Sequence, residues 1–376
     1  MYLMTALVGL LANADDVCAE IRLYCPSQME ALHQQVVGYL QQLDISPGQV
    51  TQKLDPESGL ITLSLTTPPN DTSTLDLFLR PEYALSFDQV RLPTENGKTR
   101  TVSVVSKKEI LLALLQHGRV TEFKDSFCSL EALIDDVAVR QNIVAWAQTL
   151  NWVWPNGRAA KWNRKYWIDG TPKPGVSIQV ALRDTFFHQR QYSIGCYTAT
   201  KLVVVQGILD YYRRVKHDSH GAERVERALE SDGDPLVGIE PAKMWKFEAD
   251  FDIQDMNRPG KLMEINSQVA AGNFVPGDWI YLLNTDAVTY QKTGYEGSNA
   301  LYLGRNRFDD YFNDNAHSYT YEQKLDEVYQ WRNGVFSRSR DARKIKLLTS
   351  KKLADLRNTP SDGGIQLDIR VEPMHF

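Results

Sequence analysis

The sequence predicts an α+β fold in which a helix that begins with a cysteine packs against an antiparallel sheet, with an α+β extension before it. Three observations lead to this prediction. Cys196 stands at the start of a long apolar run that suits a buried helix. Residues 244–253 (MWKFEADFDI) alternate apolar and charged side chains, as a half-buried antiparallel strand does. The first third of the chain combines helix-capping signals with alternating segments of its own.

Length and composition are those of an ordinary globular protein. The 376 residues predict about two domains and can bury a large core without metals or disulfides. With 43% hydrophobic and 24% charged residues, the composition argues against long disorder, collagen-like sequence and membrane proteins. No apolar stretch reaches the roughly 18 residues of a spanning helix. The formal net charge of −5 argues against a nucleic-acid partner held by a general basic field.

The cysteines show no metal or dithiol motif. Cys18, Cys25, Cys128 and Cys196 include no C-x-x-C pair, and no histidine stands at metal-ligand spacing from them. We therefore expect reduced cysteines and a cytoplasmic protein, with export as an effector as the alternative. The opening segment MYLMTALVGLLANA imitates a signal peptide. Because no Lys or Arg precedes its apolar run, we interpret it as a buried N-terminal helix.

Residues 1–118 form a predicted N-terminal α+β domain of unknown role. Ser27 and Glu30 have capping-box spacing before a helix of about four turns. Residues 61–65 and 75–79 alternate leucine or isoleucine with other side chains and predict two strands, which form a hairpin or lie as sheet neighbours. Ser106 and Glu109 form a second capping box, and Gly118 suits a helix end that needs positive φ.

The segment that follows opens a second predicted domain, residues 125–334. Residues 129–150 have strong helix formers and an apolar face. After them, Trp162, Tyr166 and Trp167 stand among arginines and lysines. Two interpretations stay open: the aromatic side chains line a cleft for a peptide or a nucleic acid, or they are core residues with basic side chains extending to the surface.

Cys196 is the candidate nucleophile. It stands where the buried helix starts, and a helix N-terminus offers unpaired N–H groups and a positive dipole end. These favour the thiolate and can receive an oxyanion, so this position supplies a nucleophile and part of an oxyanion hole. The alternative is a small buried hydrophobic residue, as most lone cysteines are.

Further strands are predicted downstream of the helix. The segment WIYLLN follows a turn at residues 276–278, and ALYLG ends at Gly304. A helix that begins with cysteine and packs on an antiparallel sheet is the layout of papain-like thiol enzymes, whose general base lies on those strands.

From about residue 129 to residue 304, the chain resembles the bacterial protein-glutamine γ-glutamyltransferases of the spore-coat transglutaminase type. The resemblance rests on five segments in the same order: RQNIVAWAQTL, the pair Tyr166-Trp167, YSIGCYTATKLVVV, PGDWIYLLN and GYEGSNALYLG. The last two segments also resemble strands of cell-wall cysteine peptidases, which share a papain-like core. Neither resemblance covers residues 1–118.

The resemblance implies a set of catalytic residues. Cys196 matches the family's catalytic cysteine, whereas Gly195 replaces the glutamate that precedes it in the family. The family's catalytic acid aligns with Ser298, which cannot do that work. Glu296 is two residues earlier, and residues i and i+2 of a strand share a face, so we predict that Glu296 serves instead.

A histidine that the family places shortly after this strand has no direct counterpart. Asp310 or Tyr311 takes its place, and His317 follows further on. Asp310 and His317 are therefore candidates to orient or supply the base, with His188 as a more distant one. Trp162, Tyr166 and Trp167 are then predicted to form a substrate-binding wall that excludes water.

The implied activity is acyl transfer through a cysteine thioester, which crosslinks protein glutamine to lysine by an isopeptide bond or deamidates glutamine. It needs no metal or cofactor, and its partners are proteins with accessible Gln and Lys, with neither nucleic acid nor membrane. A papain-like amidase or peptidase and a catalytically dead scaffold are the alternatives. Residues 335–376 form a predicted basic tail, in which SRSRDARKIKLLTSKKLADLR holds eight basic and two acidic residues.

Overall fold

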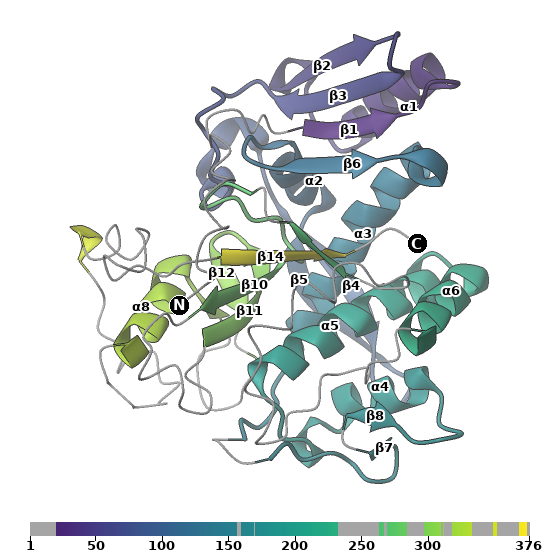
Figure 1. Ribbon diagram of the computed structural model, residues 1–376, viewed down its shortest axis with the longest axis vertical. Coiled ribbons are helices and arrows are strands. Elements are labelled where there is room, and N and C mark those ends of the chain that lie inside the picture. The colour runs from purple at the N-terminus through teal and green to yellow at the C-terminus, as the bar shows by residue number, and fades with distance from the viewer. Residues whose placement is uncertain are drawn as a thin grey trace, which may run out of the picture.

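Figure 1 shows the computed structural model of the chain, a mixed structure of helices and sheets. It describes residues 20–155, 159–168, 170–231, 263–266, 269–283, 297–309, 311, 318–332, 349–351 and 368–373. The opening segment and the alternating segment 244–253 lie outside the described residues. None of the described helices has the length and apolar character that crossing a membrane requires.

The N-terminal unit is a four-stranded sheet with two helices. Its strand order is β2 (Val50–Asp55), β3 (Leu60–Leu65), β1 (Glu20–Tyr24) and β6 (Val120–Phe123), with β1 and β6 parallel and the other pairs antiparallel. Helix α1 spans Met29–Gln42 and α2 spans Lys107–Leu115. Because β6 completes this sheet, the unit extends beyond the predicted boundary at residue 118.

Capping explains where α2 begins, whereas its last cap residue is Gln116, two residues before Gly118. The Ser106 hydroxyl accepts a hydrogen bond from the Glu109 N–H at 3.2 Å, as the capping-box spacing predicts. Gly118 has a φ of +99°, which confirms the expected positive φ after this helix. The predicted cap of α1 is wrong, since that helix begins after Gln28 and no side chain caps it.

The second predicted strand of the N-terminal unit does not form. Residues Leu77–Leu79 and Pro81–Tyr83 form 3-10 turns instead. Leu77 is buried in the main core, whereas Leu75 packs with Phe274 in a second core. The turns bury these two leucines in different directions, and β3 pairs with β2.

Helices α3 (Leu130–Ala147) and α5 (Cys196–Asp210) form the centre of the molecule. Their backbones approach closely because Gly207 has no side chain, and a Cβ there would lie 2.4 Å from Ile143 Cγ1. The hairpin of β4 (Phe87–Pro93) and β5 (Thr99–Val105) also packs against α3. Further along the chain lie β7 (Trp167–Ile168), β8 (Thr171–Pro172), α4 (Ile178–Phe187), a π-helical turn (Tyr211–Val215) and α6 (Ser219–Ser231).

A second sheet with six described strands follows these helices. Its pairings are all antiparallel, in the order β13, β12, β11, β10, β14, β9. The strands are β9 (Met263–Asn266), β10 (Trp279–Leu283), β11 (Gly297–Gly304), β12 (Arg307–Asp309), β13 (Ser318–Tyr319) and β14 (Asp368–Pro373). Strand β14 comes from the predicted basic tail, so the end of that tail is part of this sheet.

The two faces of this sheet pack against different helices. Leu301 and Leu303 of β11 join the main core with α3 and α5. Ala300 and Tyr302 join a second core with Tyr321 of α8 (Tyr321–Arg332). The alternation therefore directs odd-numbered residues of β11 toward α5 and even-numbered ones toward α8.

A disulfide joins the N-terminal unit to α3. Cys25, directly after β1, is bonded to Cys128, directly before the cap of α3. The expectation that all four cysteines are reduced is therefore wrong for this pair. A separation of 103 residues gives no spacing motif by which the sequence could have shown it.

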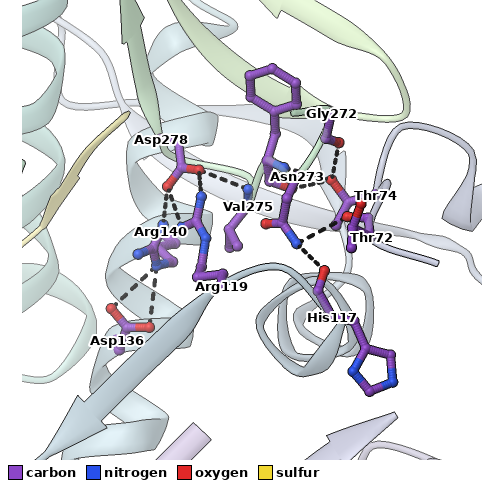
Figure 2. Close-up of polar contacts among 11 residues, drawn as sticks. Thr72, Thr74, His117, Arg119, Asp136, Arg140, Gly272, Asn273, Val275 and Asp278 are labelled. Carbon is purple, nitrogen blue, oxygen red and sulfur yellow. Dashed lines mark hydrogen bonds and ion pairs between the residues drawn. The ribbon is translucent and has the colours of Figure 1, made fainter. Parts of the chain in front are cut away.

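A buried network of charges also connects the N-terminal unit to α3 (Figure 2). Arg119, between α2 and β6, and Arg140 of α3 both bind Asp278, which precedes β10. Arg140 also pairs with Asp136 one turn earlier. Two cations and two carboxylates thus neutralise one another, and all four side chains are almost completely buried. Burial opposes ionisation, but Arg119 and Arg140 hold the pKa of Asp278 below its ordinary value.

Hydrogen bonds from side chains to backbone carbonyls hold the loop before β10 against the N-terminal unit. The Asn273 side chain donates to the His117 carbonyl at 2.9 Å, and the Thr74 hydroxyl donates to the Phe274 carbonyl at 2.6 Å (Figure 2). The Val275 N–H donates to the Asp278 carboxylate at 2.8 Å. Residues of the N-terminal unit and of the loop itself therefore hold the start of β10 in place.

Candidate active site

Cys196 is the first residue of α5, as its sequence position predicts. Gly195 before it has extended backbone angles, and its carbonyl accepts the Ala199 N–H at 2.9 Å. The cysteine is partly exposed, and among the described residues it is the free cysteine. A thiol at this place has the positive end of the helix dipole beside it.

Asn299 of β11 lies against this thiol. Its amide nitrogen donates to Cys196 Sγ at 3.4 Å, and its amide oxygen accepts the Trp279 indole N–H at 2.8 Å. An indole can only donate, so the oxygen must face Trp279 and the NH₂ group must face the sulfur. The Trp279 ring contacts Tyr197, with 5.1 Å between ring centroids. Trp279 therefore fixes the orientation of the amide that contacts Cys196.

An asparagine at this position can perform some steps of thiol chemistry but not others. Its NH₂ group can stabilise a thiolate through a charge-assisted hydrogen bond. It can also donate to an oxyanion that forms beside the sulfur. A neutral amide cannot take up or release a proton at ordinary pH, so it is not the general acid or base.

Ser298 lies on the opposite face of β11. Its hydroxyl lies 3.4 Å from Lys324 Nζ and 3.4 Å from Glu327 Oε2, both on α8. The position that aligns with the family's catalytic acid therefore does not face the thiol. We predicted Glu296 because it shares a strand face with Ser298, and the contacts of Ser298 with α8 do not support that argument. Glu296 itself lies outside the described residues and stays a prediction. Sequence reasoning missed Asn299, and β11 offers no signal for its face, because the residues on both faces of this strand are buried.

Two other predicted residues, Asp310 and His317, lie outside the described residues. Tyr311 between them is described and completely buried. Its hydroxyl is hydrogen-bonded to Thr200 Oγ1 at 2.8 Å, and Thr200 also donates to the Cys196 carbonyl at 2.8 Å. Tyr311 is thus connected to the start of α5 through Thr200.

The predicted aromatic wall is mostly core. Trp167 is buried and donates to the Ala181 carbonyl at 3.2 Å, and the buried Trp162 packs against it with 5.0 Å between centroids. Trp162 also contacts Tyr192, four residues before the cysteine. Tyr166 is half-buried and is the member of the three with exposed surface. These rings support the segment that leads to Cys196, and their substrate-binding role stays a prediction.

His188 is engaged in another cluster. Its Nε2 lies 2.8 Å from Glu95 at the tip of the β4–β5 hairpin, and its Nδ1 lies 2.7 Å from Asp184. The hydrogen bond to Glu95 raises the pKa of His188. Within the described part of the chain, no group of three or more His, Cys, Asp and Glu side chains is placed to hold a metal ion.

Comparison with protein families assigns the chain. The family model TGL, protein-glutamine gamma-glutamyltransferase, matches residues 90–353, which is more than half of the sequence and includes Cys196 and Asn299. The chain belongs to this family. It is accordingly an acyltransferase that acts on protein substrates, in a family that works through a cysteine. The match begins within β4, so it also includes α2, which we predicted to be part of the N-terminal domain.

Among solved structures, the chain is similar to the transglutaminase from Geobacillus stearothermophilus without its C-terminal extension. The two are 18% identical with a TM-score of 0.37, over 53% of this chain and 84% of the other. Comparison with curated proteins found no match.

Proposed function

We propose that this protein crosslinks other proteins by transferring the γ-glutamyl group of a bound glutamine to a primary amine, with Cys196 as the nucleophile. One observation carries the assignment of the nucleophile. The family match contains two cysteines, Cys128 and Cys196, and Cys128 is held in the disulfide with Cys25. Cys196 is not part of a disulfide and is partly exposed at a helix N-terminus, where a reactive cysteine is expected.

The chemistry proceeds in two steps. The Cys196 thiolate attacks the γ-carboxamide carbon, and ammonia leaves with an added proton to give a thioester. A lysine amine then attacks the thioester, loses a proton, and releases the thiolate with formation of an isopeptide bond. If water attacks instead, the product is glutamate. Glu296, Asp310 and His317 remain the proposed sources of the proton transfers.

Asn299 supports the first step in this proposal. Its NH₂ group is directed at the sulfur by Trp279, so the hydrogen bond to the thiolate is in place before substrate arrives. The same NH₂ group lies within reach of an oxyanion formed beside the sulfur. Asn299 thus acts as a donor, while the acid and base are supplied by other residues.

We also propose a papain-like core built from α5 and the antiparallel strands β10 to β12. The position of Cys196 at the first residue of α5 and the contacts of α5 with β11 support it. The partial exposure of Cys196 does not favour the dead-scaffold alternative, which predicts a buried thiol.

The proposed partners are proteins with accessible Gln and Lys, and neither nucleic acid nor membrane. For the compartment, the Cys25–Cys128 disulfide favours export over the cytoplasm, because disulfides persist in oxidising surroundings.

The experiment that tests this function is incorporation of a labelled primary amine into a glutamine-rich protein such as casein, using the full chain. Wild type is expected to incorporate label and to release ammonia, and Cys196→Ala is expected to do neither. Glu296→Gln is expected to lose both if Glu296 is the acid or base. Ammonia release without amine incorporation would show deamidation, and retention of either activity by Cys196→Ala would refute the assignment of the nucleophile.

A further inference from the structure

The segment before the catalytic cysteine has a charge opposite to that of the whole chain. Residues 151–195, here called the basic lobe, contain seven Lys and Arg residues but two Asp residues. The complete chain contains 42 Lys and Arg residues against 47 Asp and Glu residues. The rest of the chain taken together is therefore acidic, although the predicted basic tail is also positive. The basic lobe includes β7, β8 and α4, at the lower end of Figure 1.

Five of the six described cations of the lobe are exposed, and Lys173 is half-buried. Among the described residues, no carboxylate forms an ion pair with any of the five exposed cations, which are Lys161, Arg164, Lys165, Arg183 and Arg190. Elsewhere, many cations are paired within the protein, such as Lys124 with Glu122 and Lys216 with Asp135. The lobe thus presents positive charge to solvent.

The described acidic residue of the lobe, Asp184, does not offset this surface charge. Its side chain is buried and accepts hydrogen bonds from Asn163 at 2.7 Å and from Tyr192. It also lies beside His188. Asp184 therefore serves the interior of the lobe.

Apolar side chains are exposed on the same lobe. Val153, Ile168 and Val180 are 36%, 52% and 47% exposed. In the same lobe, Trp162 and Trp167 are buried in the core. Exposed apolar side chains among cations are suited to bind a polypeptide that carries negative charge.

Backbone hydrogen bonds connect this surface to the nucleophile. Lys161 and Ser193 exchange two backbone hydrogen bonds of 2.7 and 3.0 Å, and the Ile194 N–H donates to the Val153 carbonyl at 3.2 Å. Ser193 is three residues before Cys196, so their Cα atoms lie within about 10 Å of each other. A polypeptide that places a glutamine at Cys196 is thus close to Lys161 and Val153.

We propose that the basic lobe is the docking surface for the acyl-donor protein and that it selects glutamines within acidic segments. This proposal rests on the proposed function and specifies its substrate class. Positive charge beside the thiol attracts an acidic donor and disfavours a basic one, which lowers KM for the acidic donor. The overall negative charge of the chain makes a nucleic acid the less favoured occupant.

The test uses three peptides with one central glutamine, flanked by glutamate, by serine or by lysine. Ammonia release by the wild-type full chain gives kcat/KM for each peptide at low salt and at about 0.5 M salt. We expect the acidic peptide to exceed the basic one by about tenfold or more at low salt, mostly through KM, and the ratio to fall toward one at high salt.

Charge reversal in the protein supplies the matched comparison. Lys161→Glu and Arg190→Glu are each expected to reduce the preference for the acidic peptide, and the double variant is expected to reduce it further. Lys53→Glu, which changes an exposed lysine on β2 of the N-terminal unit, is expected to leave the preference unchanged.

The outcomes separate this proposal from the proposed function. Turnover of all three peptides at equal rates would overturn the docking proposal and leave the function standing. Absence of turnover of every peptide, the serine-flanked one included, would refute the function, and the docking proposal would fall with it. Tighter binding of a single-stranded oligonucleotide than of the acidic peptide, lost in Lys161→Glu, would assign the lobe to nucleic acid and overturn the proposal.

Discussion

Arg119 and Asp278 form an ion pair whose two side chains have no exposed surface, although the residues belong to different units and are far apart in the sequence. Asp278 immediately precedes Trp279, whose indole orients the Asn299 amide at the thiol. The N-terminal unit is thereby connected, through one buried carboxylate, to the strand that positions the candidate active site.

Removing the charge of Asp278 is expected to destabilise the protein severely. Asp278→Asn leaves Arg119 and Arg140 with one carboxylate, that of Asp136, in an environment that excludes water. Breaking a buried ion pair from one side costs about 3–5 kcal/mol. We expect a loss of that size in the free energy of unfolding, measured by denaturant titration.

The matched control for Asp278 is Asp71→Asn. Asp71 pairs with Arg80 at 2.8 Å, but the Arg80 side chain is 22% exposed and the Asp71 side chain is 28% exposed. A partly exposed pair contributes about 0.2–1 kcal/mol, so the control is expected to lose no more than that. Equal losses in the two variants would contradict a special role for the buried network.

The same network predicts how stability depends on pH. The pKa of Asp278 is lowered in the folded protein, so the folded state favours the ionised carboxylate more than the unfolded state does. The resulting stabilisation is present above the unfolded pKa of about 3.9 and is lost as pH falls through the lower folded value. The difference in unfolding free energy between wild type and Asp278→Asn is therefore expected to narrow below about pH 4. A difference that is constant from pH 7 to pH 3 would exclude this linkage.

Asn299 is predicted to contribute to thiol reactivity. Asn299→Ala removes a hydrogen bond to a group that is charged during catalysis, worth about 1.5–3 kcal/mol. This corresponds to about a 13–160-fold loss of kcat/KM for ammonia release. Alkylation of Cys196 by iodoacetamide is also expected to reach half of its maximal rate at a higher pH, because the thiolate loses a donor.

Two further variants test whether the loss in Asn299→Ala comes from the missing hydrogen bond or from a disturbed strand β11. Ser298→Ala changes the neighbouring residue on the α8 face and is expected to leave alkylation at Cys196 unchanged. Trp279→Phe keeps a ring against Tyr197 but removes the donor that orients the Asn299 amide, so it is expected to show part of the Asn299→Ala loss. If Ser298→Ala and Asn299→Ala behaved alike, Asn299 would have only a structural role.

The sequence predicted elements whose signals are local. The helices α2, α3 and α5 have caps or apolar runs within a few residues of their ends, and β10 and β11 lie in short apolar segments. The 3-10 turns at Leu77–Leu79 were missed because alternating leucines also suit a chain that buries side chains in two separate cores.

Features that depend on residues far apart in the sequence could not be predicted from local signals. Strand β14 pairs with β10 and β9 across a large separation in the chain, and the Cys25–Cys128 disulfide has no spacing motif. At the site, the position of Cys196 was predicted from its helix, but the contact of Asn299 depends on the register of β11 against α5. Because neighbouring residues of a strand face opposite sides, a resemblance in sequence alone does not show which residue of β11 faces the thiol.

The disulfide is expected to stabilise the folded protein by joining the two units. Its partners are 103 residues apart, and removing a native disulfide costs about 2–5 kcal/mol because the unfolded chain regains conformational freedom. We expect reductant to lower the free energy of unfolding of the wild type by that amount in denaturant titrations. The double variant Cys25→Ala/Cys128→Ala is expected to be less stable at the outset and insensitive to reductant, while iodoacetamide still modifies Cys196 in the folded state. Equal stability of the wild type with and without reductant would show that this bridge does not stabilise the fold.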